Sequence, residues 1–406
     1  MREAGFIVKA VCPERQPIRR AGVLTEAYGY DGLAPLKSLQ RAIDKASADL
    51  IVPCDDVTVQ HLRELYRRSF VYNGAGGPVR ALIERSLGDP ESFSIVASRS
   101  SFIRIAKEEG IRAPRTVILD GRESLKQWVE ENGLPAALKS DGSSGGMGVR
   151  IVNTFEEADR AFAALQAPPL AARAIKWALV DHDMTLIAPA FLRRTSVVNG
   201  QAYVRGTEAT STIACWQGDV LAALHFEVLK KAHPNGHSTV LRRIEDKSMD
   251  FAAQKMVQRL SLSGIYGFDF MHESHTGNAW LIEINPRTTQ VGHLTLGPGR
   301  DIPAALYAAV CGTSVRPAPA VTDKDTIALF PQESQRDPSS PFLKSGFHDV
   351  PSNETALVSA CVEKDWRQRV WQLLERGARR YRNPSAQISD CPAETWIGTG
   401  QTAEKH

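Results

Sequence analysis

Residues 137–152, ALKSDGSSGGMGVRIV, place Lys139 directly before a segment rich in glycine and serine. The apolar stretches on both sides are typical of strands, so the segment is expected to be a loop between two strands. Its glycines permit positive φ and a close approach of the backbone to an anion. The N–H groups of such a loop can surround phosphate oxygens, with Lys139 reaching the same anion. A flexible turn without a ligand is the alternative, because the loop matches neither the P-loop nor the GxGxxG pattern.

A second group of polar residues lies in residues 267–287, GFDFMHESHTGNAWLIEINPR. The turn HTGN between two apolar runs predicts a β-hairpin. Side chains repeat every second residue along a strand, so Glu283 and Asn285 share a face, to which Asp269 can point from the partner strand. Two carboxylates and an amide oxygen are ligands that Mg²⁺ or Mn²⁺ prefers. A buried ion-pair cluster around Arg287 is the alternative.

The segments that must position these residues have an α/β pattern. Over residues 1–94, short apolar runs alternate with helical patterns, which predicts a small domain with a parallel sheet. Its strands are expected in FIVKAVC (6–12) and DLIVPCDD (49–56), with a helix over PLKSLQRAIDKA (35–46) between them. The first strand of a doubly wound domain is not recognisable before residue 6.

Further along the chain, helical and strand patterns alternate up to the acidic hairpin. Helices are predicted in SRSSFIRIAKEEG, ESLKQWVEENG, TFEEADRAFAAL and MDFAAQKMVQRLSLSG, and strands in PAALKS, GVRIV and several segments between 185 and 230. Thr154 and Glu157 have capping-box spacing, and Gly110 is typical of a helix C-terminus. From residue 313 the chain becomes proline-rich, and the last clear helix is expected over 365–382, with its arginines on a solvated face.

Composition excludes several classes of function. The net charge of +3 and the charged content of 23% do not indicate nucleic acid as a partner. No apolar run has the roughly 18 residues of a membrane span, and the N-terminus has no signal-peptide core. The six cysteines are far apart without a CxxC pair, which favours reduced thiols over disulfides or a metal site. We therefore expect a cytoplasmic protein; whether it forms a homodimer stays open.

The motifs ALKSDGSSGGMGV, GFDF and LIEINPR, in this order, resemble those of the ATP-grasp superfamily. The resemblance covers residues 95–312, and it implies an ATP-grasp fold preceded by a small Rossmann-like parallel-sheet domain. The implied domains are 1–94, 95–312 and a C-terminal α/β extension, 313–406. Within 95–312, a first subdomain would span about 110–198 and a nucleotide and metal subdomain about 199–312.

The resemblance also implies roles for single residues. The phosphates of ATP would be bound by Lys139 and by the loop Gly142, Ser143, Ser144, Gly145, Gly146, Met147 and Gly148. QAYVRGTE (201–208) is similar to the family's hinge, where the backbone of Tyr203 and Val204 would bind adenine and Glu208 would support the ribose. Asp269, Glu283 and Asn285 would hold Mg²⁺ or Mn²⁺, with Arg287 near the transferred phosphate.

Some positions depart from the family's pattern. Arg99 stands where a lysine is common, and its guanidinium can still bind phosphate. Ala202 stands where the hinge often carries an acid. The segment after Arg287, TTQVGHLTLGPG, matches no single substrate class, although Gln290 and His293 are candidates for the acceptor site. Lys230 and Arg242 are weaker phosphate candidates, for which a surface position is the favoured alternative.

The implied function is that of an ATP- and magnesium-dependent ligase, which joins a carboxylate to an amine through an acyl phosphate. Lys139, Arg99 and Arg287 would neutralise charge on the transferred phosphoryl group. Two alternatives stay open. One is an ATP-grasp enzyme with another acceptor, such as a phosphotransferase or a carbamoyl-phosphate-type ligase. The other is a non-catalytic nucleotide-binding module.

Overall fold

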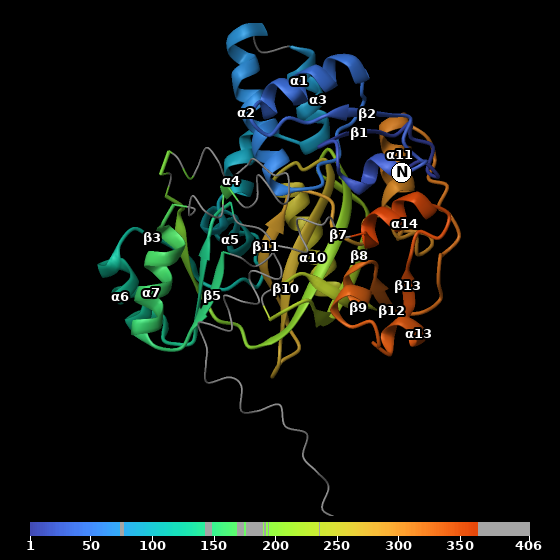
Figure 1. Ribbon diagram of the computed structural model, residues 1–406. Helices are drawn as coiled ribbons and strands as arrows, with labels where there is room; N and C mark the ends of the chain where they lie inside the picture. Colours follow the sequence, from blue (N-terminus) through green and yellow to red (C-terminus); the bar gives the residue numbers. More distant parts are fainter. Residues whose placement is uncertain are drawn as a thin grey trace, which may run out of the picture. The chain divides into compact units, whose positions relative to one another are not determined.

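The computed structural model describes residues 1–73, 77–142, 148–168, 174–175, 190, 192–193, 195–234 and 236–363. The chain divides into one unit over Met1–Val362 and a second over Glu363–His406, and only the first is described below (Figure 1). The helix predicted over 365–382 lies outside the described residues.

The N-terminal region combines a two-stranded sheet with three helices. Strands β1 (Lys9–Cys12) and β2 (Glu26–Gly29) pair in parallel, with a short 3-10 helix (Pro17–Arg20) between them. The helices are α1 (Pro35–Ala46), α2 (Asp56–Asn73) and α3 (Pro78–Leu87). Leu39, Leu62 and Ile83, one from each helix, meet in a common apolar core. The predicted helix over 35–46 and the parallel sheet are therefore confirmed.

The predicted strand over 49–56 is wrong. Residues 50–54 form no strand and pair with no strand. Their backbone bonds elsewhere, because Ile51 N–H donates to Ser86 Oγ (2.8 Å) and the Pro53 carbonyl accepts from Thr288 N–H (3.0 Å). The second strand of the sheet is instead β2, whose sequence EAYG lacks the apolar run of a buried strand.

A four-stranded antiparallel sheet follows, in the order β3-β6-β4-β5. Its strands are β3 (Thr116–Leu119), β4 (Ala136–Ser140), β5 (Val149–Val152) and β6 (Val198–Ala202). Helices α6 (Arg122–Asn132) and α7 (Phe155–Gln166) pack on it through Trp128, Leu138 and Phe162. Gly200 permits this close packing, since a Cβ there would lie 2.9 Å from Trp128 Cδ2.

The larger sheet has seven strands in the order β11-β10-β7-β8-β9-β12-β13, antiparallel except for the parallel pair β12–β13. The strands are β7 (Gly206–Trp216), β8 (Asp219–Lys231), β9 (Ser238–Ile244), β10 (Gly264–Glu273), β11 (Ala279–Asn285), β12 (Thr326–Leu329) and β13 (Phe347–Asp349). Strands β12 and β13, from the predicted C-terminal extension, thus continue the sheet that carries the acidic hairpin. The domain boundaries themselves stay predictions.

Helices cover both faces of this sheet. Helices α4 (Phe93–Ala97), α5 (Arg99–Glu108) and α10 (Lys247–Arg259) pack on one face, where they share a core with Ile213. Helix α11 (Ile302–Cys311) packs with Ala214 in a separate core. Because adjacent strand residues point to opposite sides, Ile213 and Ala214 identify the two faces. The remaining short helices are a 3-10 turn (Pro90–Ser92), α12 (Gln332–Arg336), α13 (Phe342–Ser345) and α14 (Thr355–Val362).

Local signals in the sequence account for several helix ends. Helix α7 begins where predicted, since Thr154 Oγ1 accepts from Glu157 N–H (3.2 Å) and Glu157 accepts from Asn153 N–H (2.8 Å). Gly110, just after α5, has a φ of +75°, as expected of a glycine that ends a helix. No helix within the described residues has the length and apolarity needed to span a membrane.

Candidate functional site

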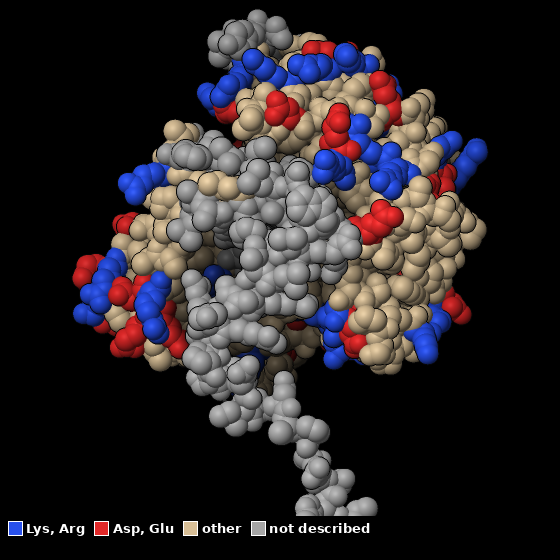
Figure 2. Space-filling view, viewed as in Figure 1, with Lys and Arg blue, Asp and Glu red and all other residues tan. Residues whose placement is uncertain are grey.

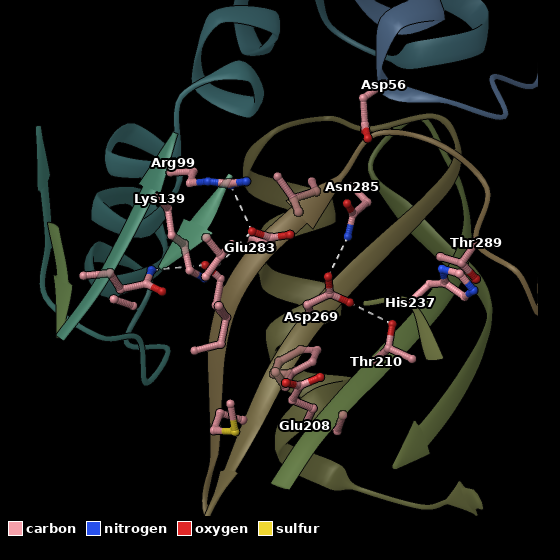
Figure 3. A pocket seen from close by; sticks show the side chains of 18 of the residues that line it. Asp56, Arg99, Lys139, Glu208, Thr210, His237, Asp269, Glu283, Asn285 and Thr289 are labelled. Atoms are coloured by element: carbon pink, nitrogen blue, oxygen red, sulfur yellow. Dashed lines mark hydrogen bonds and ion pairs between the residues drawn. The ribbon is translucent and has the colours of Figure 1, made fainter. Parts of the chain in front are cut away.

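A cavity of about 820 Å³ lies between the two larger sheets (Figure 3). Strands β4 and β5 contribute to it from the four-stranded sheet, and β7, β8, β10 and β11 from the seven-stranded sheet. Strands β6 and β9, the end of α4, the N-terminal turns of α2 and α5 and several connecting segments also line it. Residues that are far apart in the sequence therefore share one space.

On the face that Figure 2 shows, described Lys and Arg side chains lie interspersed with Asp and Glu. Such a mixed surface is not typical of a nucleic-acid-binding face.

One end of the cavity is formed by the predicted hinge. Tyr203 and Val204 lie in the short connection between β6 and β7 and line the cavity. Glu208 follows on β7, where its Oε1 accepts from Lys231 Nζ (2.7 Å). Backbone groups and an ion-paired carboxylate thus lie at the same end.

Lys139 and Arg99 converge on Glu283 in the middle of the cavity. Arg99, the first residue of α5, donates from Nη1 to Glu283 Oε2 (2.9 Å), and Lys139 Nζ on β4 lies 3.9 Å from the same oxygen (Figure 3). Asp141 accepts from Asn199 Nδ2 (2.9 Å) and lies 3.8 Å from Arg99 Nε. Arg99 Nε is buried without a hydrogen-bond partner among the described residues, which leaves a donor for an anion.

Asp269 lies beside Glu283 on the hairpin. The two residues are register partners on β10 and β11. Asp269 accepts from Thr210 Oγ1 (2.9 Å) and from Asn285 Nδ2 (2.8 Å) (Figure 3). The structure therefore brings Asp269, Glu283 and Asn285 together at one place in the cavity.

Burial and charge shift the pKa values of these groups in different directions. Burial, followed by repulsion from Glu283, raises the pKa of Asp269 to about 6. Burial also acts to raise the pKa of Glu283, but Arg99 and Lys139 outweigh it and hold that pKa below its usual value. Burial lowers the pKa of Lys139 to about 8, an effect that Glu283 opposes and Arg99 reinforces. An anionic ligand would stabilise the charged form of a buried ammonium of this kind.

The donor set fits a hard divalent cation. Asp269 and Glu283 are partly buried neighbours that repel each other, and a cation between them would remove this cost. The Asn285 amide supplies a further oxygen, at present hydrogen-bonded by Arg287 Nη2 (3.3 Å). The described residues contain no group of three or more His, Cys, Asp or Glu side chains placed to hold a metal ion, so an amide oxygen would have to take part. Oxygen ligands of two carboxylates and an amide match Mg²⁺ or Mn²⁺ better than zinc.

Of the predicted glycine loop, only the ends are described. Gly142 lines the cavity with a φ of +71°, and the Gly148 carbonyl accepts from Ser140 N–H (2.9 Å), which closes the β4–β5 hairpin. Residues 143–147, to which we assigned phosphate contacts, lie outside the described residues. The positive φ of Gly142 disfavours any residue with a side chain there.

The other predicted residues divide into those inside and outside the cavity. Arg287 and Gln290 line it, whereas His293 does not and pairs with Asp349 (2.9 Å). Lys230 is exposed, and Arg242 is paired with Glu227 on the surface, in agreement with the favoured surface position.

Several lining residues were missed by the sequence interpretation. Lys231 lines the cavity in place of Lys230, because β8 has register irregularities on either side of residue 230. The N-terminal region contributes Asp56, which accepts from Arg287 Nε (3.1 Å), together with Gln60 and Arg63. The spacing of these three residues on a helical segment is the only signal that could have identified them.

Comparisons with known proteins place this site within a known fold. Residues 98–296 match the family model of the carbamoyl-phosphate synthase L chain, ATP-binding domain, a stretch that contains every predicted site residue. No curated protein matches the chain.

Solved structures with similar folds include three nucleotide complexes. One is the biotin carboxylase domain of a Hydrogenobacter thermophilus 2-oxoglutarate carboxylase, in complex with MgADP, ADP and bicarbonate. It is 17% identical to this chain, with a TM-score of 0.54, and the match covers 78% of this chain and 67% of that chain. A Staphylococcus aureus N5-carboxyaminoimidazole synthetase with ADP is 17% identical, with a TM-score of 0.52 and coverages of 78% and 74%. A Campylobacter jejuni biotin carboxylase with β,γ-ATP is 15% identical, with a TM-score of 0.54 and coverages of 78% and 68%. The fold class expected from the sequence is thereby confirmed.

Proposed function

We propose that this chain is a member of the ATP-grasp superfamily and an ATP- and magnesium-dependent ligase that joins a carboxylate to an amine through an acyl phosphate. The observation that carries the proposal is the convergence of Lys139 and Arg99 on Glu283, beside Asp269, in a single cavity. Buried charges of both signs at this density are typical of a functional site.

The cavity has groups for each part of the nucleotide. The backbone at Tyr203 and Val204 would bind adenine, and Glu208, oriented by Lys231, would contact the ribose. Lys139, Arg99 and the loop 142–148 would bind the phosphates. Their positive charge and N–H groups would replace the water that solvates the phosphates in solution.

Asp269, Glu283 and Asn285 would hold the magnesium ion, which when bound would screen the negative charge of the phosphates. Arg287 is oriented by Asp56 and Asn285 at the end of the acidic hairpin, where its guanidinium can stabilise the transferred phosphoryl group.

The reaction has two steps. A carboxylate oxygen of the first substrate attacks the γ-phosphorus of ATP, and the bond to ADP breaks. The amine of the second substrate then attacks the acyl carbon, loses a proton, and inorganic phosphate leaves. Because the acyl phosphate hydrolyses in water, catalysis would require the cavity to keep it from solvent.

The test is an ADP-release screen of carboxylates, each with and without amines, in the presence of Mg²⁺. We expect metal-dependent ADP release that needs a particular acid, and hydroxylamine added in place of the amine should yield the hydroxamate of that acid. Phosphorylation of an acceptor without hydroxamate would indicate a phosphotransferase. ATP binding without ADP release on any substrate would indicate a non-catalytic module.

Bicarbonate is the second candidate for the acid, as in a carbamoyl-phosphate-type ligase. The match to a carbamoyl-phosphate synthase model supports it, as does the bicarbonate in the Hydrogenobacter complex. ADP release that disappears in bicarbonate-free buffer and returns on addition of bicarbonate would identify this acid.

We also propose the domain division 1–94, 95–312 and 313–406 and a cytoplasmic location. The free thiols of the described cysteines support a reducing compartment. The Hydrogenobacter structure is a dimer, which makes a homodimer the first assembly to test for this chain.

A further inference from the structure

One face of helix α2 lines the cavity although no predicted site residue lies on it. Asp56, Val59, Gln60 and Arg63 all contribute to the lining. Their spacing of three, four and seven residues from Asp56 places them on one side of a helix. At 1.5 Å per residue, Arg63 lies roughly 10 Å along the helix axis from Asp56.

This face is joined to the reactive end of the cavity at two points. Asp56 accepts from Arg287 Nε (3.1 Å), and Figure 3 shows it above Asn285. Gln60 lies next to the start of the glycine loop, since a Cβ on Gly142 would lie 3.3 Å from Gln60 Nε2. The helix therefore contacts both the predicted phosphate loop and the arginine of the hairpin.

Arg63 differs from the other Lys and Arg residues of the described lining. Arg99, Lys139, Lys231 and Arg287 each have a carboxylate partner. No ion pair or hydrogen bond links Arg63 to any residue that the structure describes, and its Nε is buried without a partner. Its guanidinium lies over the ring of Phe93, 5.6 Å from the centroid, a contact that leaves the N–H groups at its edge available.

A half-buried guanidinium without an anion is costly. Burial lowers the pKa of Arg63, and the nearby Asp56 carboxylate, which forms no ion pair with it, opposes this effect only in part. A buried polar group without a hydrogen bond is uncommon in folded proteins, and at the wall of a cavity it indicates a ligand. The ligand group that an arginine fork binds best is a carboxylate or a phosphate.

We propose that Arg63, with Gln60 beside it, is the binding site for an anionic group of the second substrate, an amine that carries a carboxylate or a phosphate. The assignment to the second substrate rests on the proposed function, which allots the ATP phosphates to Lys139, Arg99 and the glycine loop. The existence of an anion site at Arg63 does not depend on it.

The experiment uses the full chain saturated with Mg²⁺ and a non-hydrolysable ATP analogue, so that the γ-phosphate position is occupied. Inorganic phosphate and succinate are titrated separately by calorimetry into wild type, Arg63→Met and the control Arg67→Met. Arg67 lies on the same helix, is exposed and pairs with Glu64. We expect at least one of the two anions to bind wild type and the control alike, and to bind Arg63→Met at least about tenfold more weakly. The affinity for the analogue should stay within about twofold in all three proteins.

A second readout separates binding from a structural role. Methionine has a similar length and no charge, so the melting temperature of Arg63→Met should equal or exceed that of wild type. If Arg63→Met does not fold, Arg63→Gln replaces it in the same titrations.

Three results would overturn the proposal. In the first, neither anion binds wild type. In the second, Arg63→Met binds both as wild type does. In the third, the variant loses affinity for the ATP analogue, which would make Arg63 part of the nucleotide site. A chain that binds no analogue at all contradicts the proposed function instead, and the same titrations on the free protein then still test Arg63.

Discussion

Two polar clusters of opposite character lie on the seven-stranded sheet. In the first, Ser211 Oγ and His225 Nδ1 share a hydrogen bond (2.6 Å) between β7 and β8, and His225 Nε2 bonds Asp250 Oδ1 (2.8 Å) on α10. In the second, Asp269 and Glu283 lie side by side on β10 and β11. The first contains a serine, a histidine and an aspartate in contact, yet it does not line the cavity.

The difference lies in how completely each cluster satisfies its groups. Ser211 is fully buried and each nitrogen of His225 has one partner, so neither residue has a group left for a ligand; the third member, Asp250, is exposed and does not line the cavity. In the cavity, by contrast, the pKa of Asp269 is raised, the pKa of Lys139 is lowered and Arg99 Nε has no acceptor. A satisfied network stabilises a fold, whereas unsatisfied charge beside a cavity indicates binding. The residue types alone would have favoured the wrong cluster.

The largest effect on activity is expected when a proposed metal ligand of the second cluster is replaced. Glu283→Gln should lower metal-dependent ADP release by about 10³-fold or more, because the charge that holds the ion is removed. Asp269→Asn should lower ADP release to a similar extent, and it also removes the repulsion between residue 269 and Glu283. Far-UV circular dichroism should show an intact fold for both. A variant with wild-type ADP release would remove that residue from the metal site.

The next effect concerns nucleotide affinity. Lys139→Ala removes a buried cation from the cavity and should weaken binding of an ATP analogue by about 10- to 100-fold, the loss expected for a charged hydrogen bond. Calorimetry measures it, and Lys230→Ala, an exposed neighbour of the lining residue Lys231, is the control that should bind as wild type. Equal affinity in the two variants would contradict the phosphate assignment.

A pH dependence of nucleotide binding should follow from the same lysine. With a pKa of about 8 in the free chain, Lys139 is mostly charged at pH 7 and mostly neutral at pH 9. Since the charged form binds phosphate, affinity should fall roughly tenfold between these values. The arginine of Lys139→Arg stays charged at both pH values, so the affinity of this variant for the nucleotide should change much less. A wild-type profile as flat as that of Lys139→Arg would argue against a titrating Lys139.

Substitutions in the first cluster, Ser211–His225–Asp250, should have the smallest effect on activity. They should nevertheless lower the stability of the fold. Ser211→Ala leaves His225 Nδ1 buried without its partner, which should lower the free energy of unfolding by about 1–3 kcal/mol in urea denaturation. Its kcat should equal that of wild type. A large loss of kcat without a loss of stability would show that the two clusters are not separate in function.

Much of the fold could be predicted because its signals are local. Thr154 caps α7 through Glu157, Gly110 ends α5, and HTGN joins two strands, each within a few residues of sequence. The acidic hairpin was predicted for the same reason: period-two alternation puts Glu283 and Asn285 on one face. The prediction of a strand over 49–56 was wrong because an apolar run does not indicate whether a neighbouring strand is available to pair with it.

By itself, the sequence determined most element types and the order of the motifs on which the resemblance to the ATP-grasp superfamily rests, since these depend on short-range periodicity and on residue chemistry. Only the tertiary structure decided that α2 faces the cavity, that Lys231 and not Lys230 enters it, and that Arg63 forms no ion pair with a described carboxylate. Such facts depend on strand register and on contacts across 184 residues, as between Arg99 and Glu283, or 231 residues, as between Asp56 and Arg287. Packing sets these distances, and no local pattern encodes them.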